Sequence, residues 1–348
     1  MFDKEIVIGL TKISNDSAVY VIAEAGVNHG GDIEVAKKLV DVAVDAKVDA
    51  VKFQAFRTEH LIVEGVEKAP YQQNTTGNTE SQADMLRGLE LRYEHYKELK
   101  DYCDSKGVHF LITPFDEVSL HELEKLGVLG YKIASTDTTN LPFIKKVAET
   151  GKPIILSTGM CDLNEVDAAV KEIEKSNNQL ILLQCTANYP IKDNEVNLAV
   201  IPEYANRYKC IVGYSDHTVG IGAAPFAIPY GAKVVEKHFT LNKDEDGPDH
   251  RASLDPKELA EFVTIVRRAE QFHGSSIKLP TASELQTKQS LQKCLVAAEN
   301  ILEGETFSLE NMVAKRTGGH GISPIKYEQI IGKKASKNFQ KNEIISID

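Results

Sequence analysis

The sequence predicts an α/β protein, a (β/α)8 barrel followed by a small β-rich domain, and three observations support this. From residue 19 onward, short β-branched runs alternate with amphipathic helical stretches. Eight strand–helix units fit within about 250 residues, which is the size of a closed barrel of this type. Near residue 291 the pattern changes to short strands and turns. A doubly wound open sheet is the alternative, but no glycine-rich dinucleotide turn accompanies the units, and this favours closure.

The eight predicted strands are short apolar runs, most of which end on polar residues. Asp32 is predicted to cap the helix after the first strand, with Val35 starting its buried stripe. Gly107 is predicted to end a later helix, because glycine suits the position after a helix C-terminus. In chain order the strands are expected at residues 19–26, 49–56, 108–115, 130–135, 153–159, 180–186, 210–216 and 233–239.

The change of pattern divides the chain into three expected segments. Residues 1–273 would form the barrel, and residues 274–290 would form a linker that contains one polar helical turn. Residues 291–348 would form the small β-rich domain. This last segment is less acidic than the rest of the chain, which would suit a cap over an anionic ligand.

Composition excludes some partners. The chain is 42% hydrophobic and 26% charged and has a formal net charge of -11, so we expect neither a nucleic-acid nor a membrane partner. A small anionic substrate stays compatible with this charge if lysines or arginines gather at one place. The first residues do not resemble a secretory signal, and the five cysteines have no paired spacing. We therefore expect a cytoplasmic protein with reduced thiols.

Polar side chains occur at the end of every predicted strand. Because side chains alternate along a strand, Lys52 and Gln54 share one face while Phe53 takes the other. Active sites of such barrels gather at the carboxyl ends of the strands, so we expect a functional mouth there. The other polar residues at the strand ends are Glu24, Thr113, Lys132, Ser135, Ser157, Asn188, Tyr189, Ser215 and His217.

Two lysines on inward faces suggest an anion site. A single lysine is more often a surface residue, but Lys52 and Lys132 occur with several hydroxyl groups. Ammonium and hydroxyl groups around one concavity suit a phosphate or a carboxylate. Glu24 is either a buried ion-pair partner of a lysine or a group that moves a proton, and the sequence leaves both open.

Two histidines end successive strands. On the last strand, Glu236 and His238 share a face and Lys237 points away. His217 ends the strand before it, so the two imidazoles could approach closely and hold a divalent first-row metal. With only two clear protein ligands, water or substrate would complete the sphere. Asp216, beside His217, could pair instead with neighbouring backbone or a helix.

Three loops complete the set of candidate segments. A tight turn after the last strand presents Asp249, and a glycine-rich loop in the small domain presents Arg316. Both are weak signals, because ordinary solvent-exposed polar turns have similar sequences. The insertion at residues 69–86 is long for a barrel loop, and long loops on this face of a barrel often contact substrate.

The motifs together resemble the N-acetylneuraminate (sialic acid) synthase family, which includes the legionaminate synthases. They occur in order across nearly the whole chain and read IAEAGVNHGGD, AVKFQAF, ITPFD, YKIAS, ILSTGM, QCTANYP, YSDHTVG, VEKHFT, GPDH and KRTGGHGIS. The resemblance implies a (β/α)8 barrel followed by a small antifreeze-like (β-clip) domain. It also implies a metal-dependent condensation of phosphoenolpyruvate with an N-acylated hexosamine aldehyde and water. The products would be a nonulosonic acid and phosphate, with cleavage of the C–O bond of phosphoenolpyruvate.

The resemblance also implies a role for each matching residue. His217 and His238 would hold the metal, with Mn2+ expected first and Mg2+ or Co2+ as alternatives, and Glu24 would lie beside the reacting carbons. Phosphoenolpyruvate would be bound by Lys52, Lys132, Ser135, Ser157, Ser215 and Asn188. The sugar would be contacted by Gln54, Thr113, Asp137, Tyr189, Asp249 and Arg316.

Arg316 would reach into the barrel of the partner in a domain-swapped homodimer. The chain also departs from the family pattern in two places. Asp137 stands where many relatives carry the longer glutamate, and Ala187 stands where some carry the asparagine that is found here one residue later, at Asn188. Both changes bear on which sugar is used more than on the chemistry.

The resemblance leaves the sugar open. N-acetylmannosamine is the first expectation and 2,4-diacetamido-2,4,6-trideoxymannose, the precursor of a legionaminate, is the alternative, with pseudaminate synthesis less favoured. A catalytically silent barrel that binds a carbohydrate or a partner is the remaining hypothesis. The presence of Glu24, Lys52, Lys132, His217 and His238 argues against it.

Overall fold

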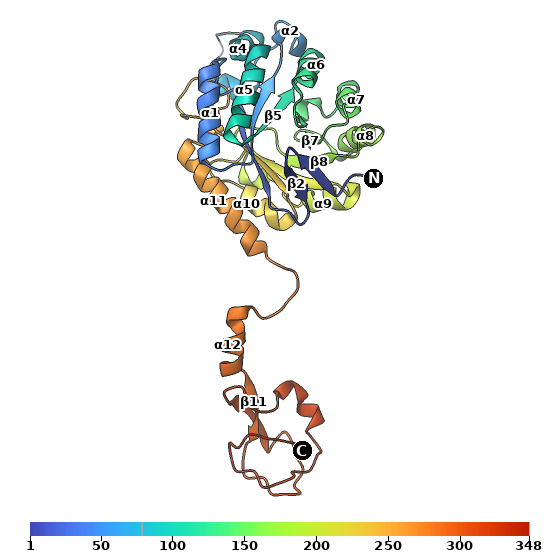
Figure 1. Ribbon diagram of the computed structural model, residues 1–348, viewed down its shortest axis with the longest axis vertical. Coiled ribbons are helices and arrows are strands. Elements are labelled where there is room, and N and C mark those ends of the chain that lie inside the picture. The colour runs from blue at the N-terminus through green and yellow to red at the C-terminus, as the bar shows by residue number, and fades with distance from the viewer. Residues whose placement is uncertain (78, 348) are drawn as a thin grey trace. The chain divides into compact units, whose positions relative to one another are not determined.

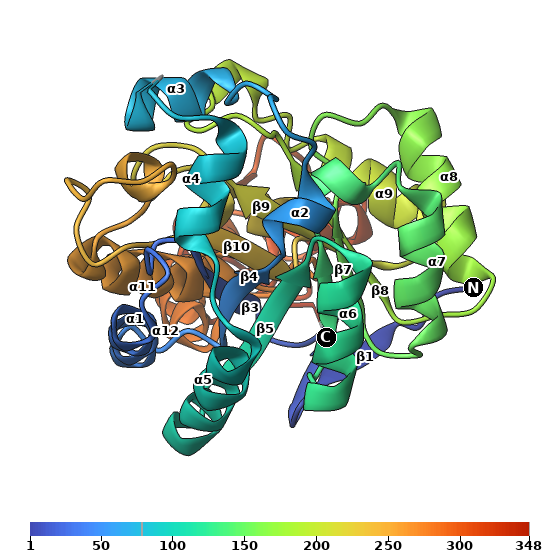
Figure 2. The ribbon, with the colours of Figure 1, turned by 90° about the horizontal axis from the view of Figure 1, so that it is seen from above.

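The computed structural model describes residues 1–77 and 79–347 and forms two compact units. The first runs from Met1 to Gly274 and the second starts at Ser275. In the first unit, eight parallel strands form a closed barrel in which the last strand pairs with the first, and this confirms the predicted fold (Figures 1 and 2). The strands are β3 (Tyr20–Gly26), β4 (Ala50–Ala55), β5 (His109–Pro114), β6 (Tyr131–Ile133), β7 (Ile154–Ser157), β8 (Leu180–Cys185), β9 (Ile211–Asp216) and β10 (Val234–His238).

Helices surround the strands and bury one apolar stripe each against them (Figure 2). Asp32 caps the first helix by accepting hydrogen bonds from the backbone N–H groups of Glu34 and Val35, as predicted. The buried stripe of that helix starts one residue later than expected, at Ala36. The long helices are α1 (Ile33–Asp45), α5 (Tyr93–Lys106), α6 (Glu117–Leu126), α7 (Leu141–Glu149), α8 (Leu163–Glu174), α9 (Val200–Tyr208) and α11 (Pro256–His273), with the short α10 (Ala224–Ala227).

The buried face of α1 runs through Ala36, Leu39, Val40 and Ala43 at helical spacing, and Val35 lies beside this face and is only partly buried. At the other predicted boundary, Gly107 follows α5 in the left-handed conformation with φ of 74°, which confirms that helix end. The insertion after β4 folds into α2 (Thr58–Leu61), α3 (Pro70–Thr76) and α4 (Gln82–Leu89).

A hairpin that the sequence did not predict precedes the barrel. β1 (Glu5–Ile8) and β2 (Thr11–Ser14) pair antiparallel. Their isoleucines pack with residues from the first half of the barrel strands, among them Ile22, Leu111 and Ile181. The hairpin therefore fills the amino end of the barrel with side chains and leaves the carboxyl end for the site.

The second unit has its own apolar core. β11 (Lys293–Ala297) and β12 (Met312–Arg316) form an antiparallel pair, and the rest is mostly turns around buried residues such as Leu295, Phe307 and Phe339. Within the same unit, ahead of β11, α12 (Ala282–Leu291) spans ten residues where one helical turn was expected. A capping box of Thr281 and Glu284 starts this helix, and none of its residues is buried. Within the described residues, no helix is long and apolar enough to cross a membrane.

We predict that Ile13→Ala destabilises the barrel, because its fully buried side chain is part of the cluster at the amino end. The expected loss in the free energy of unfolding is about 2–5 kcal/mol. Urea unfolding followed by circular dichroism measures it. Leu10→Ala in the same hairpin is the control, because Leu10 is 100% exposed, and it should leave stability almost unchanged. Equal effects of the two substitutions would contradict the proposed packing of the hairpin.

Candidate active site

A small cavity at the carboxyl end of the barrel gathers most of the predicted residues. The strand ends supply polar side chains to it, and Phe115 and Ala134 complete its wall. The volume is about 70 Å³, well below the roughly 300 Å³ at the lower end of ordinary ligand pockets. Its polar lining comprises Glu24, Lys52, Gln54, Thr113, Lys132, Ser135, Ser157, Cys185, Tyr189, Ser215, His217, Glu236 and His238.

Alternation along β4 positions Lys52 and Gln54 as the sequence predicted. Lys52 Nζ lies 2.7 Å from Glu24 Oε2 and donates to Thr113 Oγ1 at 3.2 Å. Gln54 donates to Glu24 Oε1 at 3.0 Å. Phe53 points to the other side, where it stacks on Phe110 beneath the helices. The inward face of β4 therefore holds the Glu24 carboxylate from two sides.

Glu236 is the centre of the charge cluster, although the sequence analysis gave it no role. Its Oε1 lies 3.7 Å from Lys52 Nζ and 3.6 Å from Lys132 Nζ, and accepts a hydrogen bond from Ser215 at 3.1 Å. Burial alone raises the pKa of the Glu236 carboxyl, but the Lys132 and Lys52 ammonium groups outweigh it and lower that pKa to about 2. Glu236 is thus ionised at neutral pH and balances the two lysines.

Three further pKa shifts follow from burial in this cavity. Burial lowers the pKa of Lys132, although Glu236 opposes the shift. Burial raises the pKa of Glu24, although Lys52 opposes that shift. Burial also raises the pKa of Asp249 to about 7. A buried cluster with perturbed groups of both signs is typical of a functional site.

His217 and His238 lie side by side at the rim, with ring centroids 5.5 Å apart. Burial lowers the pKa of each to about 3, so both imidazoles are neutral at pH 7. His217 Nδ1 lies 2.8 Å from the Thr186 carbonyl oxygen, which can only accept, so Nδ1 carries the proton and Nε2 keeps its lone pair. His238 Nδ1 is buried without a hydrogen-bond partner.

These features fit a divalent metal held by two imidazoles. A neutral imidazole whose other nitrogen donates to a carbonyl is the usual form of a metal-bound histidine. Among the residues described, no cluster of three or more His, Cys, Asp or Glu side chains has the geometry of a metal site. A metal on His217 and His238 would therefore need water or substrate oxygens as its other ligands.

Aromatic rings cover the two imidazoles. The ring of Tyr189 lies 4.0 Å from that of His217, centroid to centroid, and 4.9 Å from that of Tyr71 on α3. Thr75, also on α3, donates to the Pro248 carbonyl oxygen at 3.4 Å. The insertion after β4 thus contacts the mouth, as its length suggested. Because the cavity is small, this cover must move for substrates to enter.

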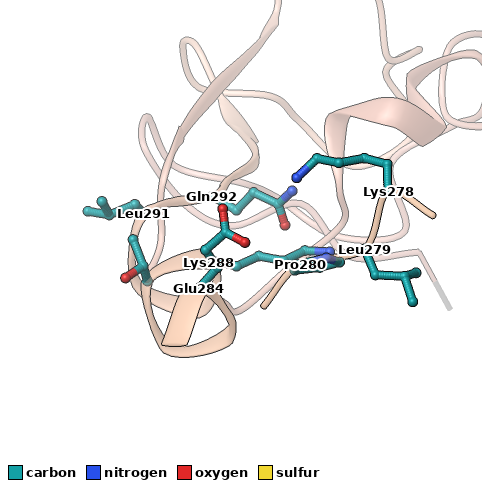
Figure 3. A pocket seen from close by; sticks show the side chains of 8 residues that line it. Lys278, Leu279, Pro280, Glu284, Lys288, Leu291 and Gln292 are labelled. Atoms are coloured by element: carbon teal, nitrogen blue, oxygen red, sulfur yellow. The ribbon is translucent and has the colours of Figure 1, made fainter. Parts of the chain in front are cut away.

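A larger hollow lies on the second unit along α12 (Figure 3). Its walls are side chains between Lys278 and Gln292, and all of these residues are exposed. Charges in such a position are screened by water, in contrast to those of the barrel cavity. We therefore assign the candidate site to the barrel.

Comparison with known protein families matches both units of the chain. The profile described as NeuB family matches residues 39–278, and the profile described as SAF domain matches residues 292–348. The chain belongs to the NeuB family. Its second unit is accordingly the small antifreeze-like domain that the resemblance implied.

Individual NeuB relatives match over nearly the whole chain. The N,N'-diacetyllegionaminic acid synthase of Campylobacter jejuni is 44% identical over 93% of this chain and 98% of its own length. The enzyme of the same name from Legionella pneumophila is 39% identical over 95% and 94%. The solved N-acetylneuraminic acid synthetase of Leptospira borgpetersenii, in complex with citrate, has a TM-score of 0.73 and 34% identity, covering 82% of this chain and 95% of its own. Relatives of this kind are enzymes, so we treat this NeuB chain as one.

Three residues assigned from the NeuB resemblance lie outside the cavity. Asn188 is exposed and does not line it, because β8 ends at Cys185 and strand alternation stops there. Asp137 is buried on the turn after β6, where it accepts a hydrogen bond from Asn140 at 3.1 Å. Arg316 is an exposed residue at the end of β12 in the second unit. Asp249 lies at the cavity edge, 4.0 Å from His238 Nδ1.

Other residues in or beside this cavity had no predicted role. Glu236 was detectable, because alternation placed it on the face of His238. Cys185 lines the cavity as a free thiol, and burial raises its pKa to about 12. Tyr71 could not be paired with Tyr189 from sequence, because the two residues are far apart in the chain.

We predict that Glu236→Gln destabilises the protein by about 3 kcal/mol, because it leaves two buried ammonium groups short of negative charge. Inorganic phosphate should then raise the melting temperature of the variant more than that of the parent, since the anion supplies the missing charge. Differential scanning fluorimetry with and without phosphate measures both effects.

The control is Glu149→Gln, which breaks a surface pair with Lys145 in which Glu149 is 54% exposed. It should behave like the parent. If phosphate shifts the melting temperatures of Glu236→Gln and the parent equally, Glu236 does not balance an anion site.

Proposed function

We propose that the chain condenses phosphoenolpyruvate with an N-acylated sugar aldehyde and water to give a nonulosonic acid and phosphate. The observation that supports this most directly is a buried mouth in which two lysines and three serine hydroxyls adjoin two neutral imidazoles. Such a mouth offers an anion site beside a metal site, and phosphoenolpyruvate and an aldehyde require these two kinds of binding.

The anion site is formed by residues on neighbouring strands. Lys52 and Lys132 would bind the phosphate and carboxylate of phosphoenolpyruvate, with Ser135, Ser157 and Ser215 as further hydrogen-bonding partners. Ser157 Oγ is buried without a partner, as expected of a hydroxyl that serves a ligand. Asn188 has no part in this proposal, because its side chain is exposed.

The proposed reaction forms one carbon–carbon bond and breaks one carbon–oxygen bond. C3 of phosphoenolpyruvate bonds to the aldehyde carbon, whose oxygen takes a proton, while water adds to C2. The hydroxyl group that water leaves on C2 then gives its proton to the departing phosphate, as the bond between C2 and the bridging oxygen breaks and C2 becomes a carbonyl carbon. Glu24, held by Lys52 and Gln54, is the carboxyl group suited to orienting that water and accepting its proton.

The metal in this proposal is inferred from the chemistry of the two imidazoles. His217 and His238 would hold the divalent ion, and Mn2+ is our first choice, with Mg2+ or Co2+ as alternatives. When bound, it would polarise the aldehyde oxygen as a Lewis acid. Tyr189 would exclude water from this position by covering both rings.

The sugar is inferred from relatives. Two relatives named N,N'-diacetyllegionaminic acid synthase are 44% and 39% identical, whereas the solved N-acetylneuraminic acid synthetase is 34% identical. This order favours 2,4-diacetamido-2,4,6-trideoxymannose over N-acetylmannosamine, our first expectation from sequence. Asp249, Gln54, Thr113 and Tyr189 lie where they can contact either sugar, at the cavity or its edge.

We predict that phosphate is released when phosphoenolpyruvate, Mn2+ and the diacetamido sugar are incubated together. N-acetylmannosamine and the pseudaminate precursor sugar run in parallel, and the diacetamido sugar should give the highest kcat/KM. Phosphoenolpyruvate labelled with ¹⁸O at the bridging position should transfer the label to phosphate, which reports C–O cleavage. No release with any of the three sugars would refute the proposal.

His238→Ala in the same assay tests the metal site. It should lower turnover by more than about 100-fold and abolish the response to added Mn2+, because it removes one of two protein ligands. His121→Ala, which changes an exposed histidine on α6, is the control. Unchanged turnover in His238→Ala would refute the assignment of the ligand.

We further propose, on the family resemblance, that the chain is a domain-swapped homodimer and that Arg316 acts in the barrel of the partner. Exchanging subunits between Arg316→Ala and Lys52→Met should then create dimers with one intact site. In an equal mixture about a quarter of the parent activity should return. Each variant exchanged with itself is the control. No recovery after exchange, verified by mass spectrometry, would show that Arg316 acts in its own chain or not at all.

A further inference from the structure

A buried ion pair lies directly behind the two histidines, on the outer face of the barrel. Asp216 is the last residue of β9 and directly precedes His217, and Lys237 precedes His238 on β10. Asp216 and Lys237 are partners in the register of these two strands. Lys237 and His238 are consecutive on β10, so their side chains point to opposite faces of the sheet. Both imidazoles line the mouth, whereas neither Asp216 nor Lys237 does.

The pair is closed and fully desolvated. Lys237 Nζ lies 3.1 Å from Asp216 Oδ2 and donates to the Thr218 carbonyl oxygen at 2.6 Å. The two side chains are 1% and 0% exposed. Their charges are therefore not screened by solvent, and each has its partner within the same small cluster.

Asp216 also organises the loop that follows His217. Its Oδ1 accepts from the Thr218 N–H at 2.8 Å, and its Oδ2 accepts from the N–H groups of Ala223 and Ala224 at 3.0 and 2.9 Å. These bonds fold residues 217–224 back over the carboxylate. The backbone on both sides of His217 is thus fixed by one side chain.

Gly222 shows how closely the loop packs on the pair. It adopts φ of +65°, and a Cβ atom there would lie 1.8 Å from Thr218 Oγ1 and 2.7 Å from Lys237 Nζ. Only glycine fits this position. The backbone of the loop at Gly222 therefore approaches the ion pair too closely for any side chain to lie between them.

We propose that the Asp216–Lys237 pair is a positioning device that fixes the separation and orientation of His217 and His238, and so sets the affinity of these imidazoles for a divalent cation. The inference rests on the metal site of the proposed function. Each member of the pair is adjacent in sequence to one histidine, and the ion pair joins the two strands. A change in the pair would therefore alter the positions of both rings. Neither charged group touches the cavity, so their role is exerted through the histidines.

Stability alone is the rival explanation. Apolar residues in place of a buried ion pair are often equally stabilising, so the pair is not required for barrel folding as such. A structural role would lower the melting temperature without changing the affinity of the folded protein for metal. A positioning role changes the affinity, by about 10–100-fold for groups that orient metal ligands.

The test is Mn2+ binding to the full-length protein without substrates. Electron paramagnetic resonance of free Mn2+ gives the dissociation constant for the parent, Lys237→Met and Arg267→Met, at a temperature where all are folded. Arg267→Met is the matched control, since it breaks the Arg267–Asp49 ion pair of 2.8 Å, which lies at the amino end of the barrel strands. Lys237→Met should weaken Mn2+ binding at least about 10-fold, while Arg267→Met should leave it unchanged.

A milder variant keeps the test valid if Lys237→Met does not fold. Asp216→Asn preserves size and part of the loop hydrogen bonding, and it should also weaken Mn2+ binding at least about 10-fold. Parent-like affinity in either folded variant would overturn the positioning role. A parent that releases phosphate but binds no Mn2+ would overturn both the metal site and this inference, while leaving the anion site of the proposed function intact.

Discussion

Five residues of β10 pair in parallel with five residues of β3, and this register closes the barrel. The two strands are more than 200 residues apart in the chain, yet the pairing sets His238 directly opposite Glu24. On the other side of β3, Glu24 pairs with Lys52 in register. A closed sheet therefore places carboxylate, ammonium and imidazole groups from three strands within one cavity. In an open sheet with the same strands, the first and last strands would be apart, and His238 would no longer lie next to Glu24.

The charges within the cavity balance one another. Glu24 and Glu236 carry the negative charge against Lys52 and Lys132, and all four side chains are at most 4% exposed. Burying isolated charges at this depth would be prohibitive, so each lysine depends on a carboxylate that, on the proposed roles, it would share with a substrate. This competition offers a physical reason for the hydroxyl groups around the lysines. They add neutral hydrogen-bonding partners without adding further charge to desolvate.

The strands and the inward faces could be predicted because both depend on local patterns. Alternation alone placed Lys52 and Gln54 inside, Phe53 outside, and Lys237 away from His238. The amino-terminal hairpin escaped because its few alternating residues gain stability only from contact with the finished barrel. The buried stripe of α1 starts at Ala36 and not at the predicted Val35. The sequence pattern thus located the buried side of this helix only to within one residue.

Roles that depend on distant contacts could not be predicted. Tyr71 contacts Tyr189, although the two residues are more than 100 positions apart in the chain. Neither segment contains a pattern that predicts this contact. Asn188 was placed by analogy with a strand end, but the strand had already ended at Cys185. Asp216 accepts hydrogen bonds from neighbouring backbone N–H groups, as the sequence suggested, whereas its ion pair with Lys237 follows only from the β9–β10 register. The sequence thus identified candidate polar residues, whereas the strand pairing determined which side chains each of them contacts.

The hairpin that packs against the amino end of the barrel has a kinetic consequence. With that end filled by isoleucines, the substrates and products of the proposed reaction would all pass through the carboxyl end. The lysines lie on the strands themselves, whereas Tyr71 lies on α3 and Tyr189 on the loop after β8. On the proposed roles, phosphoenolpyruvate must arrive before the sugar, and phosphate must leave after the sugar acid. The fold would therefore impose a compulsory order on turnover, without any moving part beyond the aromatic cover.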